Sequence, residues 1–135
     1  AKIIKMARDV NDGKPAWVIE QVKAALEGKE SSTVAALGIA FKNDIDDLRE
    51  SPSLNIVKTL GEENPDLDIR VVEPNVAELP DSLSSVSNLK KQDLETAVHD
   101  ADVVLLLVNH KEFLQMDTAL LEGKSVIDTK GIWRS

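Results

Sequence analysis

The chain has 135 residues, enough for one domain with a single core. Its 24 Asp and Glu against 16 Lys and Arg give a net charge of -8, which disfavours nonspecific binding to nucleic acid or to anionic membranes. The absence of cysteine excludes disulfides, thiolate metal sites and a cysteine nucleophile. The longest apolar run, residues 103–108, is too short to cross a bilayer, and the first residues do not resemble a signal peptide. We therefore expect a soluble, cytoplasmic protein.

The first 30 residues are predicted to be helical in two stretches. The first stretch has apolar residues at helical spacing, namely Ile3, Ile4, Ala7 and Val10. Pro15 ends or kinks this helix and suits the first turn of the next one. The second stretch ends at Gly28 and carries an apolar stripe formed by Val18, Ile19, Val22, Ala25 and Leu26.

From residue 33 onward, apolar strands alternate with helices. Strands are predicted at 33–40, 67–72, 102–109 and 125–128, and helices at 51–61, 93–100 and 110–121, with a loose stretch at 73–91. This alternation predicts an α/β fold, a Rossmann-like doubly wound parallel sheet flanked by helices. Ligands of such sheets bind beyond the carboxyl ends of the strands, which directs attention to the loops after Ala40, Val72, Val108 and Ile127.

The loop after the first of these strands, residues 38–52, contains the strongest candidates for ligand binding. It leads into a helix N-terminus, whose free N–H groups and partial positive charge suit phosphate. Lys42 follows the strand end closely, so its ammonium group and the Phe41 backbone are predicted to contact a ligand. Gly38 is the only glycine near this strand, whereas a dinucleotide-binding turn needs three. The sheet therefore resembles a Rossmann half without its cofactor turn.

Acidic residues in the same loop leave two interpretations open. Arg49 can hold a phosphate or a carboxylate with two bonds, but it can equally pair with neighbouring aspartates that tie down the loop. A divalent cation is disfavoured by the nearby Lys42 and Arg49, although carboxylates are available at Asp44, Asp46 and Asp47. No metal site is predicted.

Histidine and tryptophan are the other residue types that often mark sites. His99 and His110 have no partner spacing for zinc and are interpreted as surface or helix-end residues, with cleft lining as an alternative for His110. Trp17 and Trp133 are assigned to packing, with shielding of a base or a subunit contact as the alternative.

The loop sequence Gly-Ile-Ala-Phe-Lys-Asn-Asp-Ile-Asp-Asp-Leu-Arg-Glu-Ser-Pro resembles the signature of the UDP-binding C-terminal domain of the UDP-glucose/GDP-mannose dehydrogenase family. The segment before Pro15 resembles the end of the family's long central helix. Within the family, the pairing of Asn-Asp-Gly-Lys-Pro with Lys-Gly-Ile-Trp-Arg is most similar to the UDP-N-acetylmannosamine dehydrogenases. Further matches to the family lie at residues 71–75, 100–104 and 127–134.

The resemblance implies two parts: the C-terminal part of the inter-domain central helix at 1–30, and a UDP-sugar-binding α/β domain at 31–135. Enzymes of this family oxidise the C6 alcohol of the sugar to a carboxylate, using NAD and a cysteine nucleophile, and their products serve polysaccharide biosynthesis. Both the cysteine and the NAD-binding domain precede the central helix. The chain is therefore expected to bind the nucleotide end of the substrate without catalysing the oxidation, and to bind no cofactor itself.

Site residues follow from the same resemblance. The expected substrate-binding residues are Phe41, Lys42, Arg49, Glu50, Ser51 and Lys130. Lys130 stands where the family often has an arginine, and the two are not equivalent at a bidentate site. Lys14 is expected to reach the site of a neighbouring subunit, because the central helix carries much of the family's dimer interface. A homodimer is therefore expected. No catalytic residue is expected in this chain.

The sequence also shares features with proteins of three other functions. A receiver-like signalling domain also has a doubly wound sheet, but it needs an aspartate at a central strand end, where this chain has Val108-Asn109-His110. A structural dimerisation module with a vestigial nucleotide site stays open. So does a dehydrogenase of another UDP-sugar, such as UDP-glucose.

Overall fold

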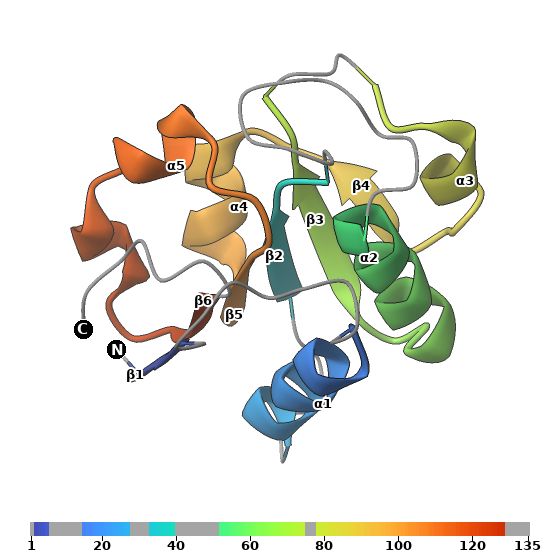
Figure 1. Ribbon diagram of the computed structural model, residues 1–135, viewed down its shortest axis with the longest axis horizontal. Coiled ribbons are helices and arrows are strands. Elements are labelled where there is room, and N and C mark those ends of the chain that lie inside the picture. Colours follow the sequence, from blue (N-terminus) through green and yellow to red (C-terminus); the bar gives the residue numbers. More distant parts are fainter. Residues whose placement is uncertain (1, 6–14, 28–32, 40–51, 75–77, 129–135) are drawn as a thin grey trace.

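The computed structural model describes residues 2–5, 15–27, 33–39, 52–74 and 78–128 (Figure 1). The strands are β1 (Lys2–Lys5), β2 (Thr33–Leu37), β3 (Asp68–Val72), β4 (Leu89–Lys91), β5 (Val103–Leu106) and β6 (Ser125–Asp128). The helices are α1 (Pro15–Leu26), α2 (Pro52–Glu63), α3 (Asp81–Ser84), α4 (Leu94–Asp100), α5 (Lys111–Leu114) and the 3-10 helix η1 (Thr118–Leu121). None of the helices described is long and apolar enough to cross a membrane.

All strand pairs in the described sheet are parallel, in the order β1-β6-β5-β2-β3-β4. Strand β2 lies in the middle, and Leu37 at its end is in register with Val72 of β3 and with Leu106 of β5. The chain first proceeds from β2 to β3 and β4, and then returns to the other side of β2 to form β5 and β6. The predicted doubly wound parallel sheet is thereby confirmed.

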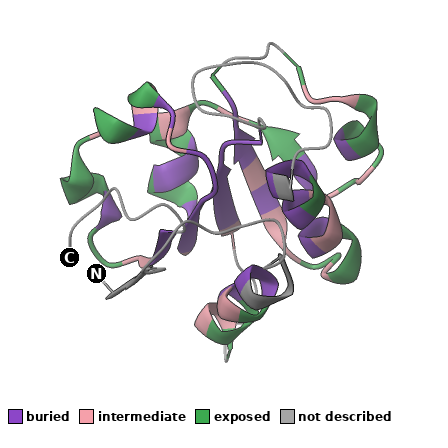
Figure 2. Cartoon of the chain, in the orientation of Figure 1, coloured by how far each residue is buried: buried purple, intermediate pink, exposed green. Residues whose placement is uncertain are grey.

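Helices cover both faces of the sheet (Figure 2). The sheet therefore separates the core into two clusters, one on each face. Because successive strand residues point to opposite faces, Val34 and Ala36 pack under α1 and α2, whereas Ala35 and Leu37 pack under α4 and α5. Aliphatic residues fill most of both clusters, as the scarcity of aromatic residues predicts. The central strands β2 and β5 are buried on both faces, which explains their nearly unbroken apolar sequences.

The helix predicted over the first residues is wrong for Lys2–Lys5. This segment forms β1, which pairs in parallel with β6. Its two isoleucines are β-branched and suit a strand, and an open sheet edge supplies hydrogen bonds that an isolated short helix lacks. The second predicted helix is confirmed as α1.

Two further expectations need correction. Helix α2 continues past Gly61 to Glu63. The glycine is required there by packing, because a Cβ at Gly61 would lie 3.0 Å from Leu89 Cδ2. The stretch predicted to be loose contains helix α3 and the edge strand β4, whose short Leu-Lys-Lys sequence has too few apolar residues to be recognised.

Candidate functional site

The carboxyl ends of β2, β3 and β5 meet at the point where the strand order reverses. Gly38 directly follows β2, and its N–H donates to the carbonyl of Val72 over 2.8 Å. Its φ is +97°, and a Cβ built at this position would lie only 2.6 Å from Cβ of Val108. The chain must therefore have glycine here, both for its backbone conformation and for the close approach of the segment that follows β5.

A buried acid–imidazole pair lies beside this glycine. Glu73 follows β3, and His110 lies just before α5; their side chains are fully enclosed. The His110 Nε2 lies 3.1 Å from Oε1 and 2.9 Å from Oε2 of Glu73. The same Oε1 accepts a hydrogen bond of 2.8 Å from the backbone N–H of Ile39. Glu73 thus joins the segments that follow all three central strands.

The buried polar residues of the described part of the chain all lie at this edge of the sheet. Ser53, in the first turn of α2, donates a long hydrogen bond of 3.4 Å to the carbonyl of Leu107. Asp128 is fully buried at the end of β6. Together with Glu73 and His110, these residues make the carboxyl edge of the sheet polar on the inside, while the rest of the core is apolar.

The interpretation of the histidines is half right. His99 is exposed, as expected, whereas His110 is a helix-end residue that is completely buried. Its ring also lies against that of Phe113, with centroids 5.4 Å apart. Sequence reasoning did not identify Glu73 as more than part of a turn. The available signal was its position directly after a buried strand, in the row of strand ends where polar side chains converge.

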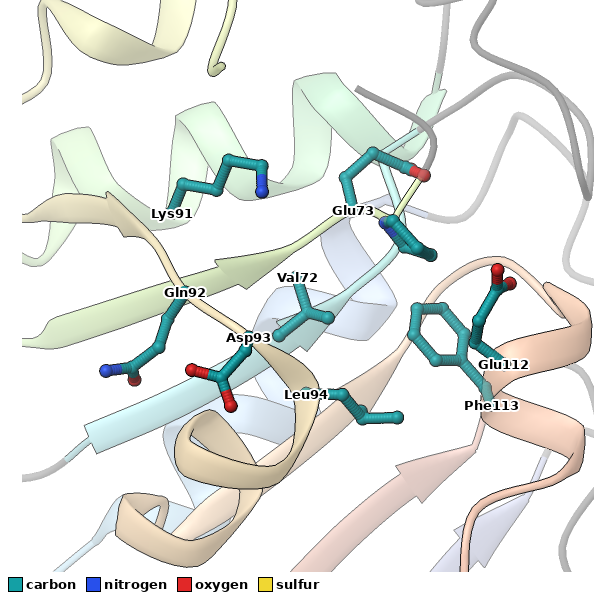
Figure 3. A pocket seen from close by; sticks show the side chains of 9 residues that line it. Val72, Glu73, Lys91, Gln92, Asp93, Leu94, Glu112 and Phe113 are labelled. Atoms are coloured by element: carbon teal, nitrogen blue, oxygen red, sulfur yellow. The ribbon is translucent and has the colours of Figure 1, made fainter. Parts of the chain in front are cut away.

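A pocket of about 300 Å³ opens on the outer side of this pair (Figure 3). Its lining is mostly apolar between two charged walls, and Figure 3 shows Lys91 and Glu112 on opposite sides with Val72 and Leu94 between them. Glu112 Oε1 is the buried side-chain atom of the described region that has no hydrogen-bond partner. The remaining lining residues are Glu73, Pro74, Gln92, Asp93 and Phe113.

The substrate-binding residues expected from the sequence lie outside the described residues. They are Phe41, Lys42, Arg49, Glu50, Ser51 and Lys130, and Lys14, the expected cross-subunit residue, also lies outside. Asp44, Asp46, Asp47, Trp133 and the side chain of Trp17 also lie outside that part. The structure does describe the two ends to which the principal loop is attached, Ile39 and α2, and both ends are at the carboxyl edge of the sheet.

Comparison with known proteins shows to which family the chain belongs. Residues 35–135 match the UDP-glucose/GDP-mannose dehydrogenase family, UDP binding domain. The chain belongs to this family. The match begins within β2 and includes the loop that follows it and every later strand, so the carboxyl edge described above is the corresponding edge of a UDP binding domain.

Individual relatives agree with this assignment. The chain is 44% identical over 142 residues to a UDP-N-acetyl-D-mannosamine dehydrogenase of Yersinia pestis, covering 99% of this chain and 33% of that protein. It is 43% identical over 133 residues to an NDP-N-acetyl-D-galactosaminuronic acid dehydrogenase of Ralstonia solanacearum, covering 98% and 30%. Among solved structures, the UDP-N-acetyl-mannosamine dehydrogenase of Staphylococcus aureus has a TM-score of 0.69 at 30% identity, covering 93% and 29%. The chain thus spans about a third of the length of its family relatives.

Proposed function

We propose that this chain binds the uridine diphosphate end of a nucleotide sugar, as the substrate-binding domain of an NAD-dependent UDP-N-acetylmannosamine dehydrogenase. The observation that carries the proposal is the family match over 35–135, which includes the loop that follows Ile39 at the topological switch point. A crevice at this point is where open α/β sheets bind their ligands.

The chemistry of the loop supports phosphate binding. Lys42 follows the buried Ile39 by three residues, so chain geometry limits its Cα to about 11 Å or less from that of Ile39. We assign the diphosphate to Lys42 and the Phe41 backbone, and assign Arg49, Glu50 and Ser51 to the shape of the loop. Lys130 follows the buried Asp128 by two residues and is proposed to reach the substrate from the carboxyl end of β6.

The family match supports the uridine diphosphate part of the ligand, whereas the identity of the sugar rests on similarity to individual relatives. The mannosamine and galactosaminuronic acid relatives are almost equally similar to this chain, at 44% and 43% identity. N-acetylmannosamine is preferred because the pairing of the segment at 11–15 with that at 130–134 resembles that subfamily. The second candidate is a dehydrogenase of UDP-N-acetylgalactosamine, on the strength of the Ralstonia relative. NAD, the oxidation itself and a homodimer formed through the central helix belong to the proposed whole enzyme.

Isothermal titration calorimetry of the chain with UDP, UDP-N-acetylmannosamine and UDP-N-acetylgalactosamine tests this function. We expect saturable binding of UDP, and a loss of about tenfold or more in Lys42→Ala because a charge-assisted contact to phosphate disappears. Lys23→Ala is the matched control, since Lys23 is exposed and lies 3.9 Å from Glu63 at the far end of α2. It removes the same charge and should leave the affinity unchanged.

The outcomes separate the alternatives. Tighter binding of one acetylated sugar than of UDP would identify the substrate. Equal losses in both lysine variants would show a nonspecific charge effect and reject Lys42 as a contact. If no uridine nucleotide binds, the role left for the chain is that of a structural dimerisation module.

A further inference from the structure

We propose that Glu73 is a positioning residue for the nucleotide loop: it holds the backbone of Ile39, and His110 holds Glu73 in turn. This inference rests on the proposed function, because it assigns a purpose to the loop that begins after Ile39. It adds a residue that lies on a different strand from the loop and is not among the expected substrate contacts.

The geometry places Glu73 where it controls the start of the loop. Ile39 is fully buried, and its N–H donates to Glu73 Oε1 over 2.8 Å. One residue earlier, the N–H of Gly38 is already held by the carbonyl of Val72. Two consecutive amide groups are thereby anchored to β3, the second of them through a side chain beyond the end of the ladder. Phe41 and Lys42 follow within three residues.

The imidazole of His110 fixes the carboxylate. Its Nε2 lies within 3.1 Å of both oxygens of Glu73, and neither side chain has more than 1% of its surface exposed. Because a carboxylate can only accept, Nε2 is the protonated ring nitrogen in this arrangement. Charge-assisted bonds of this kind are stronger than neutral ones, and burial removes competition from water. The carboxylate therefore has one defined orientation.

The topology shows why this use of an acid is unusual. In a dinucleotide-binding Rossmann unit, the acid at the end of the second strand points outward and binds the hydroxyl groups of a ribose. Glu73 has the same position, at the end of the second strand of the β2-α2-β3 unit. Its Oε1, however, is directed at Ile39 of the same chain. The acid that binds a ligand in the dinucleotide fold is here proposed to orient the loop that follows Ile39.

Three variants test the proposal. Glu73→Gln keeps the shape, and its amide can accept from Ile39 while it donates to a His110 tautomer with a free Nε2. Glu73→Leu removes both bonds at similar volume. Asn88→Ala is a matched destabilised control, because the side-chain amide of Asn88 donates to carbonyls of Gly61, Asn64 and Leu67 at the opposite edge of the sheet. Two readouts are measured for each variant: hydrogen exchange of the Ile39 amide by NMR, and affinity for UDP.

We expect the Ile39 amide to exchange at least about tenfold faster in Glu73→Leu, and UDP to bind at least about tenfold more weakly. In Glu73→Gln, both quantities should stay within about threefold of the wild type. Asn88→Ala should lower the unfolding midpoint without changing either quantity beyond its effect on global stability. If Glu73→Leu does not fold, Glu73→Ala, which leaves room for water, carries the same expectation.

The two proposals fail in different ways. If the wild type does not bind UDP, the proposed function fails for this chain, and the exchange of the Ile39 amide still tests the positioning. If Glu73→Leu exchanges Ile39 at the wild-type rate, or binds UDP as tightly as the wild type does, the positioning role is refuted while the function stands. Equal losses of affinity in Glu73→Leu and Asn88→Ala would also refute it, because both would then act through stability alone.

Discussion

The substitution Gly38→Ala tests the close approach of Gly38 to Val108. A residue with a side chain at φ +97° loses about 1–2 kcal/mol relative to its preferred conformations. The new Cβ would also lie 2.6 Å from Val108 Cβ and 3.2 Å from its backbone nitrogen, well inside an ordinary carbon contact. Since backbone atoms cannot simply rotate away, overpacking adds about 1–3 kcal/mol. We therefore expect Gly38→Ala to reduce the free energy of unfolding by about 2–5 kcal/mol.

Gly123→Ala supplies the control that separates the two contributions. Gly123 also has a positive φ, +79°, but no atom lies within 4 Å of a Cβ built there. The free energy of unfolding of Gly123→Ala should therefore fall only by the cost of the backbone conformation, about 1–2 kcal/mol. Urea denaturation followed by circular dichroism measures both variants, and the difference between them reports the contact with Val108. Equal losses in the two variants would refute the argument from close approach.

Two other predictions concern the part of the structure away from the site. Arg70 donates to both oxygens of Asp68 at 2.8 and 2.7 Å and thereby lowers the pKa of Asp68 below 3.8. A carboxyl group whose pKa is lower in the folded state stabilises the fold above its unfolded pKa. This contribution should be lost as the pH falls from 3.8 through the folded pKa. Urea titrations from about pH 6 to about pH 2.5 give the unfolding free energy as a function of pH. In Asp68→Asn this free energy should fall less steeply at acid pH than in the wild type, and an equal slope would contradict the coupling of Asp68 to Arg70. Asn88→Ala removes the side-chain donor from the carbonyls of Gly61 and Asn64 and should cost about 1–3 kcal/mol of unfolding free energy in the same assay. A loss near zero would mean that water replaces the amide.

The sequence predicts those parts of the fold that depend on local pattern. Runs of Val, Leu and Ile mark β2, β3, β5 and β6, because these strands are covered on both faces. Strand β4 escapes recognition because a three-residue edge strand with two exposed lysines has no pattern of its own and forms by pairing with β3. The sequence of Lys2–Lys5 predicts a helix although two adjacent isoleucines fit either period, and pairing with β6 makes this segment a strand.

The site shows the same division between local and distant information. That polar residues gather at strand ends follows from the alternation of elements, and the loop after β2 is identified by its residues. The contact of Glu73 with His110 joins residues 37 apart, and its contact with Ile39 joins residues 34 apart. The sequence shows an acid that closes a strand, but the direction of its side chain is set by tertiary packing.

These contacts explain how a Rossmann-like half without a glycine-rich turn can still present a nucleotide site. In a dinucleotide fold, glycines let the backbone approach a pyrophosphate, and the acid after the second strand binds the ribose. Here the space beside Gly38 is taken by Val108, and Oε1 of Glu73 is engaged with Ile39 and His110. A ligand cannot replace these partners without leaving buried polar groups unpaired, which costs more than the bonds it would make. The space between these strand ends is thus filled at the level of Ile39, and we expect a nucleotide to be recognised beyond it. The proposed contacts accordingly begin at Phe41 and Lys42, and we expect a substitution of Glu73 to weaken binding.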